Sequence, residues 1–215
     1  MNIRGAVFDL DGTLTDSMYI WNEAPKALVR RYGGDPPEDL AREIKQMGRR
    51  EASAYMKEKF RLSCSVEELM EGVNDLVTEE YRRRVPMKPG ADRLLARLAA
   101  RGIPCCIATA SESWQAQAAM ERLGLWKYFR FAVSCIQYGG KTGPEIYLEA
   151  AQRLGTRVGE TAVFEDALHA AKTARDAGFP VCGVYDASAG EDQPRLRALA
   201  TWYVRDLDEW QIDPA

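Results

Sequence analysis

Two aspartates near the start of the chain, Asp9 and Asp11, follow an apolar segment and precede Gly12. In an extended chain alternate side chains point the same way, so both carboxylates share one side while Phe8 and Leu10 face the other. Two like charges this close repel, and a divalent cation, or a proton held by one carboxylate, makes the pair tolerable. The alternative is an acidic turn that caps the following helix.

Polar residues also follow three other predicted strands. These groups are Thr109 with Ala110 and Ser111 after residues 103–108, Lys141 after residues 131–135, and Glu165 with Asp166 after residues 161–164. Because the carboxyl ends of parallel strands meet at one edge of a sheet, we expect all of them to converge with the two aspartates. Carboxylates, a hydroxyl and a cation are the groups needed to bind Mg²⁺ and a phosphoryl group side by side.

Each of these residues also has a simpler interpretation when it is taken alone. Thr109 could cap the next helix, and Lys141 could be a solvated loop cation. Glu165 and Asp166 could be an acid pair that the dipole of the following helix stabilises. The combination on four strands favours the metal and phosphoryl interpretation.

The predicted strands and helices that position these residues indicate a doubly wound α/β fold with a parallel sheet. Short apolar runs alternate with helical patterns, and the predicted strands are residues 3–8, 103–108, 131–135, 161–164, 180–184 and 201–204. Pro89 and Gly90 open a predicted helix over 91–100, Pro144 opens one over 145–154, and Gly178 ends the helix that follows Asp166. The binding crevice of such a sheet lies beyond the carboxyl ends of its strands.

A helical insert interrupts the alternation of strands and helices. We predict an α/β core of residues 1–16 and 86–215 and a helical cap of residues 17–85, joined by proline-containing linkers as a hinged lid. Helix starts inside the cap are predicted at Asp35, with Glu38 as its reciprocal partner, and at Ser65, with Glu68 in that role.

The composition is that of a globular protein able to bury a core: 215 residues, 46% hydrophobic and 28% charged, with a net charge of −3. No overall positive field would draw it to nucleic acid or to an anionic membrane, so an anionic substrate must be attracted locally. The chain has no long apolar span, and Met1–Arg4 leads directly into the first predicted strand, so we expect a cytoplasmic protein.

The five cysteines show no paired metal-binding spacing. Cys105, Cys106, Cys135 and Cys182 lie in apolar runs and are expected to be buried, reduced thiols. Cys64 lies in a more polar stretch and could be exposed.

Four motifs in order resemble those of the haloacid dehalogenase superfamily of phosphotransferases: Asp9-Leu10-Asp11-Gly12-Thr13, Thr109, Lys141-Thr142-Gly143-Pro144 and Phe164-Glu165-Asp166. The resemblance spans nearly the whole chain. The helical insert looks like the small cap of the subgroup that contains β-phosphoglucomutase and phosphoglycolate phosphatase. The family often has a serine and a glycine after its last acid pair, where this chain has Ala167 and Ala170, a departure that concerns helix packing and leaves the proposed ligands in place.

The resemblance implies a covalent mechanism. Asp9 would be the nucleophile that forms an aspartyl-phosphate. Asp11 would be the general acid and then the general base, and its backbone carbonyl would also bind the metal. Mg²⁺ would lie between Asp9, that carbonyl, Asp166 and, as the second choice of acid, Glu165.

The remaining motif residues would bind the phosphoryl group. Lys141 would balance the negative charge of its oxygens, and the Thr109 hydroxyl with the Ala110 amide would donate hydrogen bonds to them. His169, the only histidine, is assigned no role.

Substrate choice is expected to reside in the cap, because the core recognises only the phosphate. Arg49 and Arg50 are candidate contacts to a polar or acidic leaving group, with a solvated helix surface as the slightly preferred alternative. Tyr19 and Trp21 could form an apolar wall of the cleft or belong to the core of the cap.

The sequence therefore predicts a Mg²⁺-dependent phosphatase that acts on a small phosphorylated metabolite, without nucleic-acid or membrane partners, as a monomer or weak dimer. One alternative is a sugar phosphomutase of the β-phosphoglucomutase type. Such relatives usually carry a histidine in the cap linker, where this chain has Trp21, which favours hydrolysis. The other alternative is a non-catalytic protein that binds a phosphorylated metabolite, against which the intact Asp9 and Asp11 argue.

Overall fold

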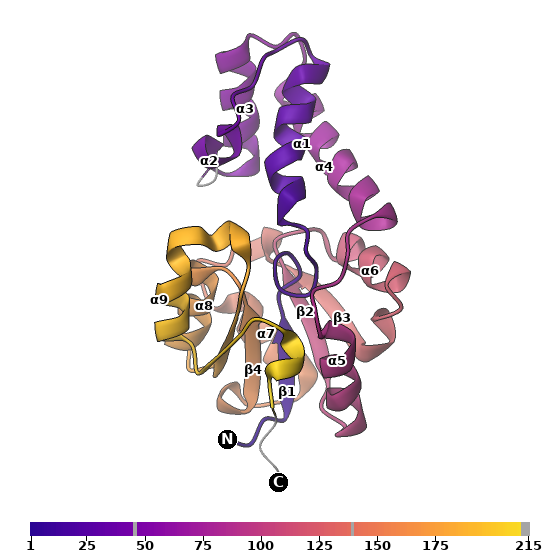
Figure 1. The fold of residues 1–215 in the computed structure, drawn as a ribbon, viewed down its shortest axis with the longest axis vertical. Helices are drawn as coiled ribbons and strands as arrows, with labels where there is room; N and C mark the ends of the chain where they lie inside the picture. Colours follow the sequence, from indigo (N-terminus) through magenta and orange to yellow (C-terminus); the bar gives the residue numbers. More distant parts are fainter. Residues whose placement is uncertain (45–46, 139, 212–215) are drawn as a thin grey trace. The chain divides into compact units, whose positions relative to one another are not determined.

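The structure is a computed structural model that describes residues 1–44, 47–138 and 140–211 (Figure 1). The chain forms two compact units, one of Met1–Asp16 with Val85–Ala215 and one of Ser17–Arg84. Val85, predicted to belong to the cap, lies in the first unit, where the Arg122 guanidinium donates to its carbonyl oxygen.

The first unit, called the core unit below, is built on a six-stranded sheet in the order β3-β2-β1-β4-β5-β6, in which every paired strand is parallel. The strands are β1 (Gly5–Phe8), β2 (Cys105–Thr109), β3 (Phe129–Ser134), β4 (Thr161–Glu165), β5 (Val181–Val184) and β6 (Trp202–Val204). Strands β1, β2, β4 and β5 are buried along their whole length, as strands covered on both faces must be. The predicted α/β class with a doubly wound sheet is confirmed.

Successive side chains of each strand point to opposite faces of the sheet, so each face has its own hydrophobic core. One face packs Val7, Cys106 and Val163 against α7 (Glu145–Leu154), α8 (Leu168–Asp176) and α9 (Gln193–Leu199). The other face carries Phe8, stacked on Phe164 with ring centroids 4.3 Å apart. The remaining helices of this unit are α5 (Ala91–Ala100) and α6 (Ser113–Arg122).

The predicted helices 91–100 and 145–154 have the predicted bounds, and α8 is followed by Gly178 in a left-handed conformation (φ 92°). Ala170 of α8 is fully buried, so this helix packs with an alanine where the family often has glycine. Strand boundaries are shifted more: the predicted strand 131–135 starts at Phe129, which pairs with Cys105, and ends at Ser134.

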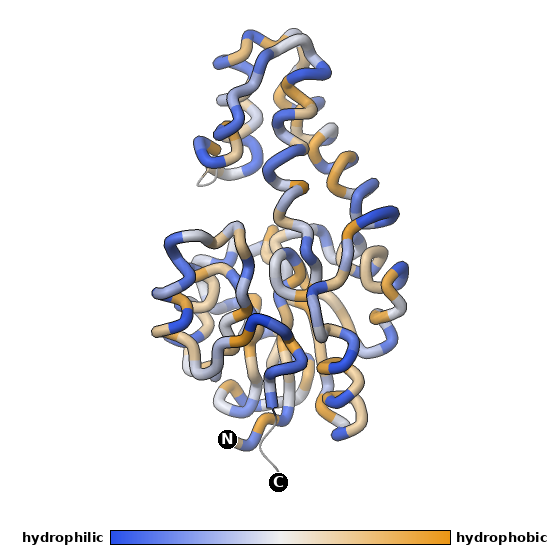
Figure 2. Tube along the Cα trace, viewed as in Figure 1, coloured by the Kyte–Doolittle hydropathy of each residue, from blue (hydrophilic) through white to orange (hydrophobic). Residues whose placement is uncertain are grey.

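The second unit is entirely helical among its described residues. It consists of α1 (Met18–Arg31), α2 (Leu40–Ile44), α3 (Arg49–Phe60) and α4 (Val66–Arg83). Their apolar faces meet in one core that includes Leu28, Leu40, Met56 and Leu69. Figure 2 shows the hydrophilic and hydrophobic residues alternating along these helices, as amphipathic helices require.

One of the two predicted helix starts in this unit is confirmed and the other is wrong. The Ser65 hydroxyl accepts from the Glu68 amide at 3.0 Å, and the Glu68 carboxylate accepts from the Ser65 amide at 2.7 Å. No such cap forms at Asp35, and helix α2 begins only at Leu40. A proline ring disfavours helical backbone angles at the residue that precedes it. Asp35 and Pro36 each precede a proline, so the sequence opposes a helix start at this point.

The two chain segments that connect the units pair with each other within the core unit. The Lys88 amide donates to the Leu14 carbonyl at 2.9 Å, and the Asp16 amide donates to the Pro86 carbonyl at 3.0 Å. An antiparallel bridge between Thr15 and Met87 lies between these two bonds. The insert therefore leaves and re-enters the core through one short two-stranded ribbon, which we call the linker ribbon.

All five cysteines are buried free thiols, as predicted for four of them. Cys64, which its polar surroundings suggested could be exposed, is only 5% exposed. Within the described part of the chain, no helix combines the length and the apolar character needed to cross a membrane.

Candidate active site

Asp9 lies directly after β1, at the carboxyl edge of the central strand. Its amide donates to the Phe164 carbonyl at 3.0 Å, which extends the pairing of β1 with β4 by one residue and fixes the backbone there. The residue is 7% exposed, and the Lys141 ammonium donates to its carboxylate. The nucleophile predicted from the sequence is thus buried next to a cation.

Lys141 joins Asp9 to the acid at the end of β4. Its Nζ lies 2.6 Å from Glu165 Oε1, and the Tyr147 hydroxyl donates to the same oxygen at 2.8 Å. Lys141 is 7% exposed and Glu165 is 1% exposed. The second oxygen of that carboxylate, Glu165 Oε2, is buried with no hydrogen-bond partner.

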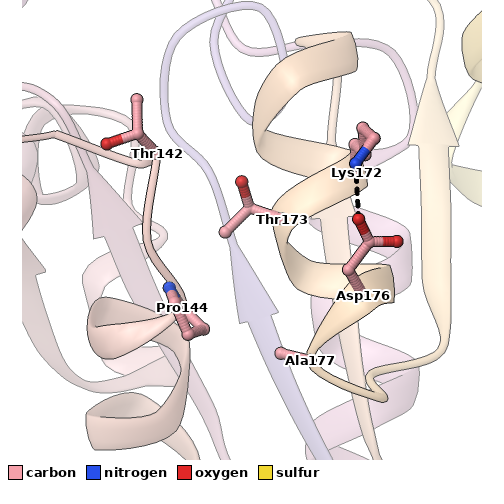
Figure 3. A pocket seen from close by; sticks show the side chains of 6 residues that line it. All are labelled: Thr142, Pro144, Lys172, Thr173, Asp176 and Ala177. Atoms are coloured by element: carbon pink, nitrogen blue, oxygen red, sulfur yellow. Dashed lines mark hydrogen bonds and ion pairs between the residues drawn. The ribbon is translucent and has the colours of Figure 1, made fainter.

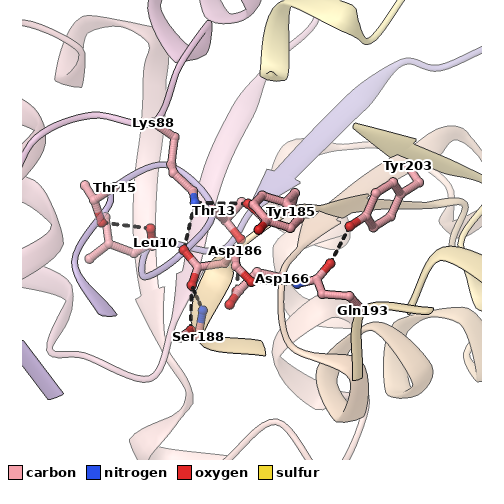
Figure 4. Close-up of polar contacts among 10 residues, drawn as sticks. All are labelled: Leu10, Thr13, Thr15, Lys88, Asp166, Tyr185, Asp186, Ser188, Gln193 and Tyr203. Atoms are coloured by element: carbon pink, nitrogen blue, oxygen red, sulfur yellow. Dashed lines mark hydrogen bonds and ion pairs between the residues drawn. The ribbon is translucent and has the colours of Figure 1, made fainter. Parts of the chain in front are cut away.

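Asp166 packs against the loop that follows Asp9. The Thr13 hydroxyl donates to Asp166 Oδ1 at 3.2 Å, a contact drawn in Figure 4. Gly12 has a φ of 83°, and a Cβ at this position would lie 2.5 Å from Asp166 Oδ2. Glycine is therefore required both by the backbone conformation and by the close approach of the carboxylate.

The electrostatics of the site show an excess of negative charge. Burial raises the pKa of Asp9 well above its ordinary value, Lys141 opposes this, and Glu165 and Asp166 add to it. The pKa of Asp166 is raised to about 8, mainly by burial and to a smaller extent by repulsion from Glu165 and Asp186. Burial disfavours the charge on Lys141, but Asp9 and Glu165 nevertheless raise its pKa well above the ordinary value.

The residues present fit a divalent cation. Asp9, Glu165 and Asp166, called the acidic cluster below, each offer one carboxylate oxygen, and these atoms lie within 4.8 Å of one another. When all three carboxylates are ionised, one ammonium leaves two negative charges for a cation to balance, and carboxylate oxygens are the ligands that Mg²⁺ prefers. The unpartnered Glu165 Oε2 is a buried acceptor that a cation would satisfy.

Asp11 is held in a different way from the acidic cluster. Its Oδ2 accepts a hydrogen bond of 3.0 Å from the Ser111 hydroxyl. The contact expected between the Asp11 backbone carbonyl and the metal stays a prediction.

Thr109 ends β2 and is fully buried, and its hydroxyl oxygen accepts from the Ser111 amide at 2.9 Å. It does not cap the next helix, because Glu112 is the residue that precedes the first turn of α6. Ala110 lies exposed in the same loop.

The structure thus brings Asp9, Lys141, Glu165 and Asp166 into contact or near-contact. Sequence reasoning missed Thr13 and Tyr147 as their partners, and it quoted Ser111 without a role. Thr13 stands inside the first motif, so its position was a signal, whereas nothing in the sequence marks Tyr147. His169 is exposed on α8.

The candidate residues of the insert lie within the helical unit. Arg49 and Arg50 are both exposed at the start of α3, and Arg50 pairs with Glu67 at 2.8 Å while its side chain stays 72% exposed. Tyr19 is 42% exposed, and Trp21 is half-buried. Neither aromatic residue is therefore part of the fully buried core of that unit.

A separate depression of about 280 Å³ lies between the start of α7 and the helix α8 (Figure 3). It is lined by Thr142, Pro144, Lys172, Thr173, Asp176 and Ala177. None of these residues belongs to the acidic cluster, so this depression is not the candidate active site.

The family of haloacid dehalogenase-like hydrolases matches residues 3–178. The chain belongs to this family. The resemblance seen in the four motifs is therefore confirmed, and with it the prediction that the protein is an enzyme of the hydrolase type.

Two curated relatives illustrate the range of the family near this chain. One is the phosphorylated carbohydrates phosphatase of Thermotoga maritima, 29% identical over 178 residues, which are 82% of each chain. Another is hexitol phosphatase A of Escherichia coli, 32% identical over 200 residues, which are 93% of this chain and 89% of the relative.

Solved structures share the fold of this hydrolase. A haloacid dehalogenase hydrolase of Entamoeba histolytica superposes with a TM-score of 0.83 at 22% identity, over 99% of this chain and 96% of that one. The β-phosphoglucomutase of Clostridium difficile superposes with a TM-score of 0.74 at 23% identity, over 98% and 94% of the two chains. At these identities the likeness concerns the fold alone.

Proposed function

We propose that this hydrolase is a Mg²⁺-dependent phosphatase that cleaves the phosphate monoester of a small phosphorylated metabolite through an aspartyl-phosphate on Asp9. The observation that carries the proposal is the buried contact of Lys141 with both Asp9 and Glu165, next to Asp166. The relatives named for phosphorylated carbohydrates and for hexitol phosphates support a sugar or polyol phosphate as the substrate class.

In the first step a carboxylate oxygen of Asp9 attacks phosphorus while the bond from phosphorus to the alkoxide breaks. The ammonium of Lys141 stabilises the ionised Asp9 against the cost of burial. The departing alkoxide takes a proton from Asp11, because an unprotonated alkoxide is a poor leaving group. Bound Mg²⁺ supplies positive charge that neutralises the phosphoryl oxygens.

The phosphoryl group needs donors that hold it in line for attack. We assign this to the Thr109 hydroxyl and the Lys141 ammonium, both of which lie buried at the carboxyl edge of the sheet. An ammonium can donate three hydrogen bonds, so Lys141 can contact a phosphoryl oxygen as well as its two carboxylates.

In the second step Asp11, now ionised, takes a proton from water, and the water oxygen attacks phosphorus. The bond between phosphorus and Asp9 breaks, inorganic phosphate leaves, and both aspartates return to their starting states. One carboxylate therefore acts as acid and base in turn, while the other forms and loses the covalent bond.

Acid-quenched turnover mixtures analysed by peptide mass spectrometry test this assignment. With sugar phosphates, phosphoglycolate and nucleotides as the substrate panel, the phosphoryl adduct is expected on the peptide that contains Asp9, and phosphate release is expected to need Mg²⁺. Asp9→Asn should abolish both the adduct and turnover. An adduct on another residue, or full turnover by Asp9→Asn, would refute the mechanism.

The same panel separates hydrolysis from the other functions. Conversion of hexose 1-phosphates to 6-phosphates faster than the release of phosphate would make the protein a mutase. Tight binding of a substrate without turnover, equal in wild type and Asp9→Asn, would make it a binding protein.

A further inference from the structure

Ser111 connects two groups to which the proposed mechanism gives different roles. It lies in the loop between β2 and α6 and is fully buried. Its amide donates to Thr109 Oγ1 at 2.9 Å, and its hydroxyl donates to Asp11 Oδ2 at 3.0 Å. The four motifs that define the family resemblance give this serine no part.

We propose that Ser111 is a positioning residue that holds the Asp11 carboxylate through its hydroxyl and orients the Thr109 hydroxyl toward the phosphoryl group through its amide. This inference rests on the proposed function, since it concerns the acid and base that Asp11 supplies.

The contact with Thr109 fixes the direction of one hydrogen. A backbone amide can only donate, so the Thr109 oxygen must be the acceptor in this bond. The lone pair used in that bond turns the hydroxyl hydrogen away from Ser111. That hydrogen remains for an acceptor such as a phosphoryl oxygen, which carries no hydrogen of its own.

The contact with Asp11 suits a group that changes its protonation state. A hydroxyl can donate to an ionised carboxylate, and after rotation about its C–O bond it can accept from a carboxylic acid. An ammonium or an amide hydrogen can do only the first. Ser111 can therefore stay in contact while Asp11 gives its proton to the leaving group and takes another from water.

The reaction needs this restraint more at Asp11 than at Asp9. Asp9 is 7% exposed and contacts Lys141, whereas Asp11 is only half-buried. A more accessible side chain has more rotamers available, and an acid held out of line loses much of its effect. The buried Ser111 hydroxyl limits that freedom.

The test compares Ser111→Ala with wild type on two esters that differ in the leaving group. A sugar phosphate leaves as a poor alkoxide that needs a proton, whereas p-nitrophenyl phosphate leaves as a stable phenolate. We expect Ser111→Ala to lower kcat/KM for the sugar phosphate, which reports on phosphoenzyme formation, about tenfold or more, the fold-change that corresponds to one hydrogen bond to a charged group. Formation of the phosphoenzyme from the aryl ester should be much less affected, while its hydrolysis is slowed, so quenched mixtures should contain more phosphoenzyme than wild type.

Controls separate positioning from damage to the fold. Ser111→Thr keeps the hydroxyl and should restore most of the lost kcat/KM. Ser134→Ala makes the same change at the end of the neighbouring strand β3, where the hydroxyl accepts from the Ile136 amide, and should leave the ratio of the two ester rates unchanged. Thermal unfolding of each variant shows whether the fold is retained.

Two results would overturn the inference while the proposed function stands: equal losses of kcat/KM on both esters for Ser111→Ala, or an unchanged kcat/KM on the sugar phosphate. Asp11→Asn provides the reference, because it should show the same dependence on the leaving group in a stronger form. Full turnover by Asp11→Asn, or the lack of an adduct on Asp9 in wild type, would instead refute the proposed function itself.

Discussion

The buried ion pair between Lys88 and Asp186 allows the most direct test of how the core unit is held together. Lys88 belongs to the linker ribbon, and Asp186 follows β5. The Lys88 Nζ lies 2.7 Å from Asp186 Oδ2 and 3.0 Å from the Tyr185 carbonyl oxygen (Figure 4). The two side chains are 10% and 3% exposed, so neither charge is well solvated.

We expect Lys88→Met to destabilise the protein by about 3–5 kcal/mol, because removal of one partner leaves a buried charge uncompensated. Ser188 still donates to Asp186 Oδ1 through its amide at 2.8 Å and its hydroxyl at 2.5 Å, but these donors carry no charge. For a chain of this size such a loss corresponds to a fall in Tm of roughly 6–20 °C.

The matched control is an exposed pair at similar distance. Lys172 Nζ lies 2.6 Å from Asp176 Oδ2, with side chains 62% and 46% exposed, and Lys172→Met is expected to cost less than about 1 kcal/mol. The double variant Lys88→Met with Asp186→Asn removes both charges and keeps an oxygen for Ser188, so it should recover much of the loss.

Urea unfolding followed by tryptophan fluorescence reports on the core unit, because Trp202 and Trp210 lie in it with ring centroids 5.5 Å apart. A Lys88→Met variant as stable as Lys172→Met would refute the reasoning. A double variant no more stable than Lys88→Met would also refute it, because the cost would then not come from the unpaired carboxylate.

Three further predictions concern the acidic cluster. Gly12→Ala should weaken Mg²⁺ binding, measured by titration calorimetry, because the added Cβ would lie 2.5 Å from Asp166 Oδ2. The control is Gly33→Ala, which has the same positive φ but whose Cβ would meet no atom within 4 Å, so it should affect stability only. The raised pKa of Asp166, about 8 against an ordinary 3.8, means that the folded metal-free protein holds a proton the unfolded chain has lost. The contribution of this proton to the free energy of unfolding is therefore complete below pH 4 and is lost as the pH rises toward 8. The affinity for Mg²⁺ rises over the same range, because the metal binds the ionised carboxylate. Calorimetric unfolding with and without Mg²⁺ checks both signs. Tyr147→Phe removes the donor to Glu165 Oε1 and should cost about 1.5–3 kcal/mol in urea unfolding, as expected for a hydrogen bond to a charged group; an unchanged midpoint would contradict it.

The sequence predicted the central strands well because they are buried on both faces and read as continuous apolar runs. It placed the start of β3 too late for the opposite reason. This strand lies at one edge of the sheet and includes the exposed Arg130, so its first residues do not form an apolar run.

The site was predictable to the extent that strand ends determine it. Asp9, Thr109 and Glu165 lie at the ends of adjacent strands, and the alternating pattern predicts parallel strands whose carboxyl ends share one edge, although the strand order itself comes only from the structure. The contacts of Tyr147 with Glu165 and of Lys88 with Asp186 were not predictable, because they depend on side-chain packing between elements that no local pattern relates. The exposed Arg50 shows the same limit, since only the structure reveals its pairing with Glu67.

The linker ribbon has a consequence for how the protein can change in evolution or by design. The segments at the two ends of the helical insert are hydrogen-bonded to each other, so the fold of the core unit does not depend on the length of chain between them. Closing a flexible loop costs only about 0.6 kcal/mol more for each doubling of its length. This junction is therefore a point at which the helical unit can be exchanged for an insert of different length without a change in the core unit.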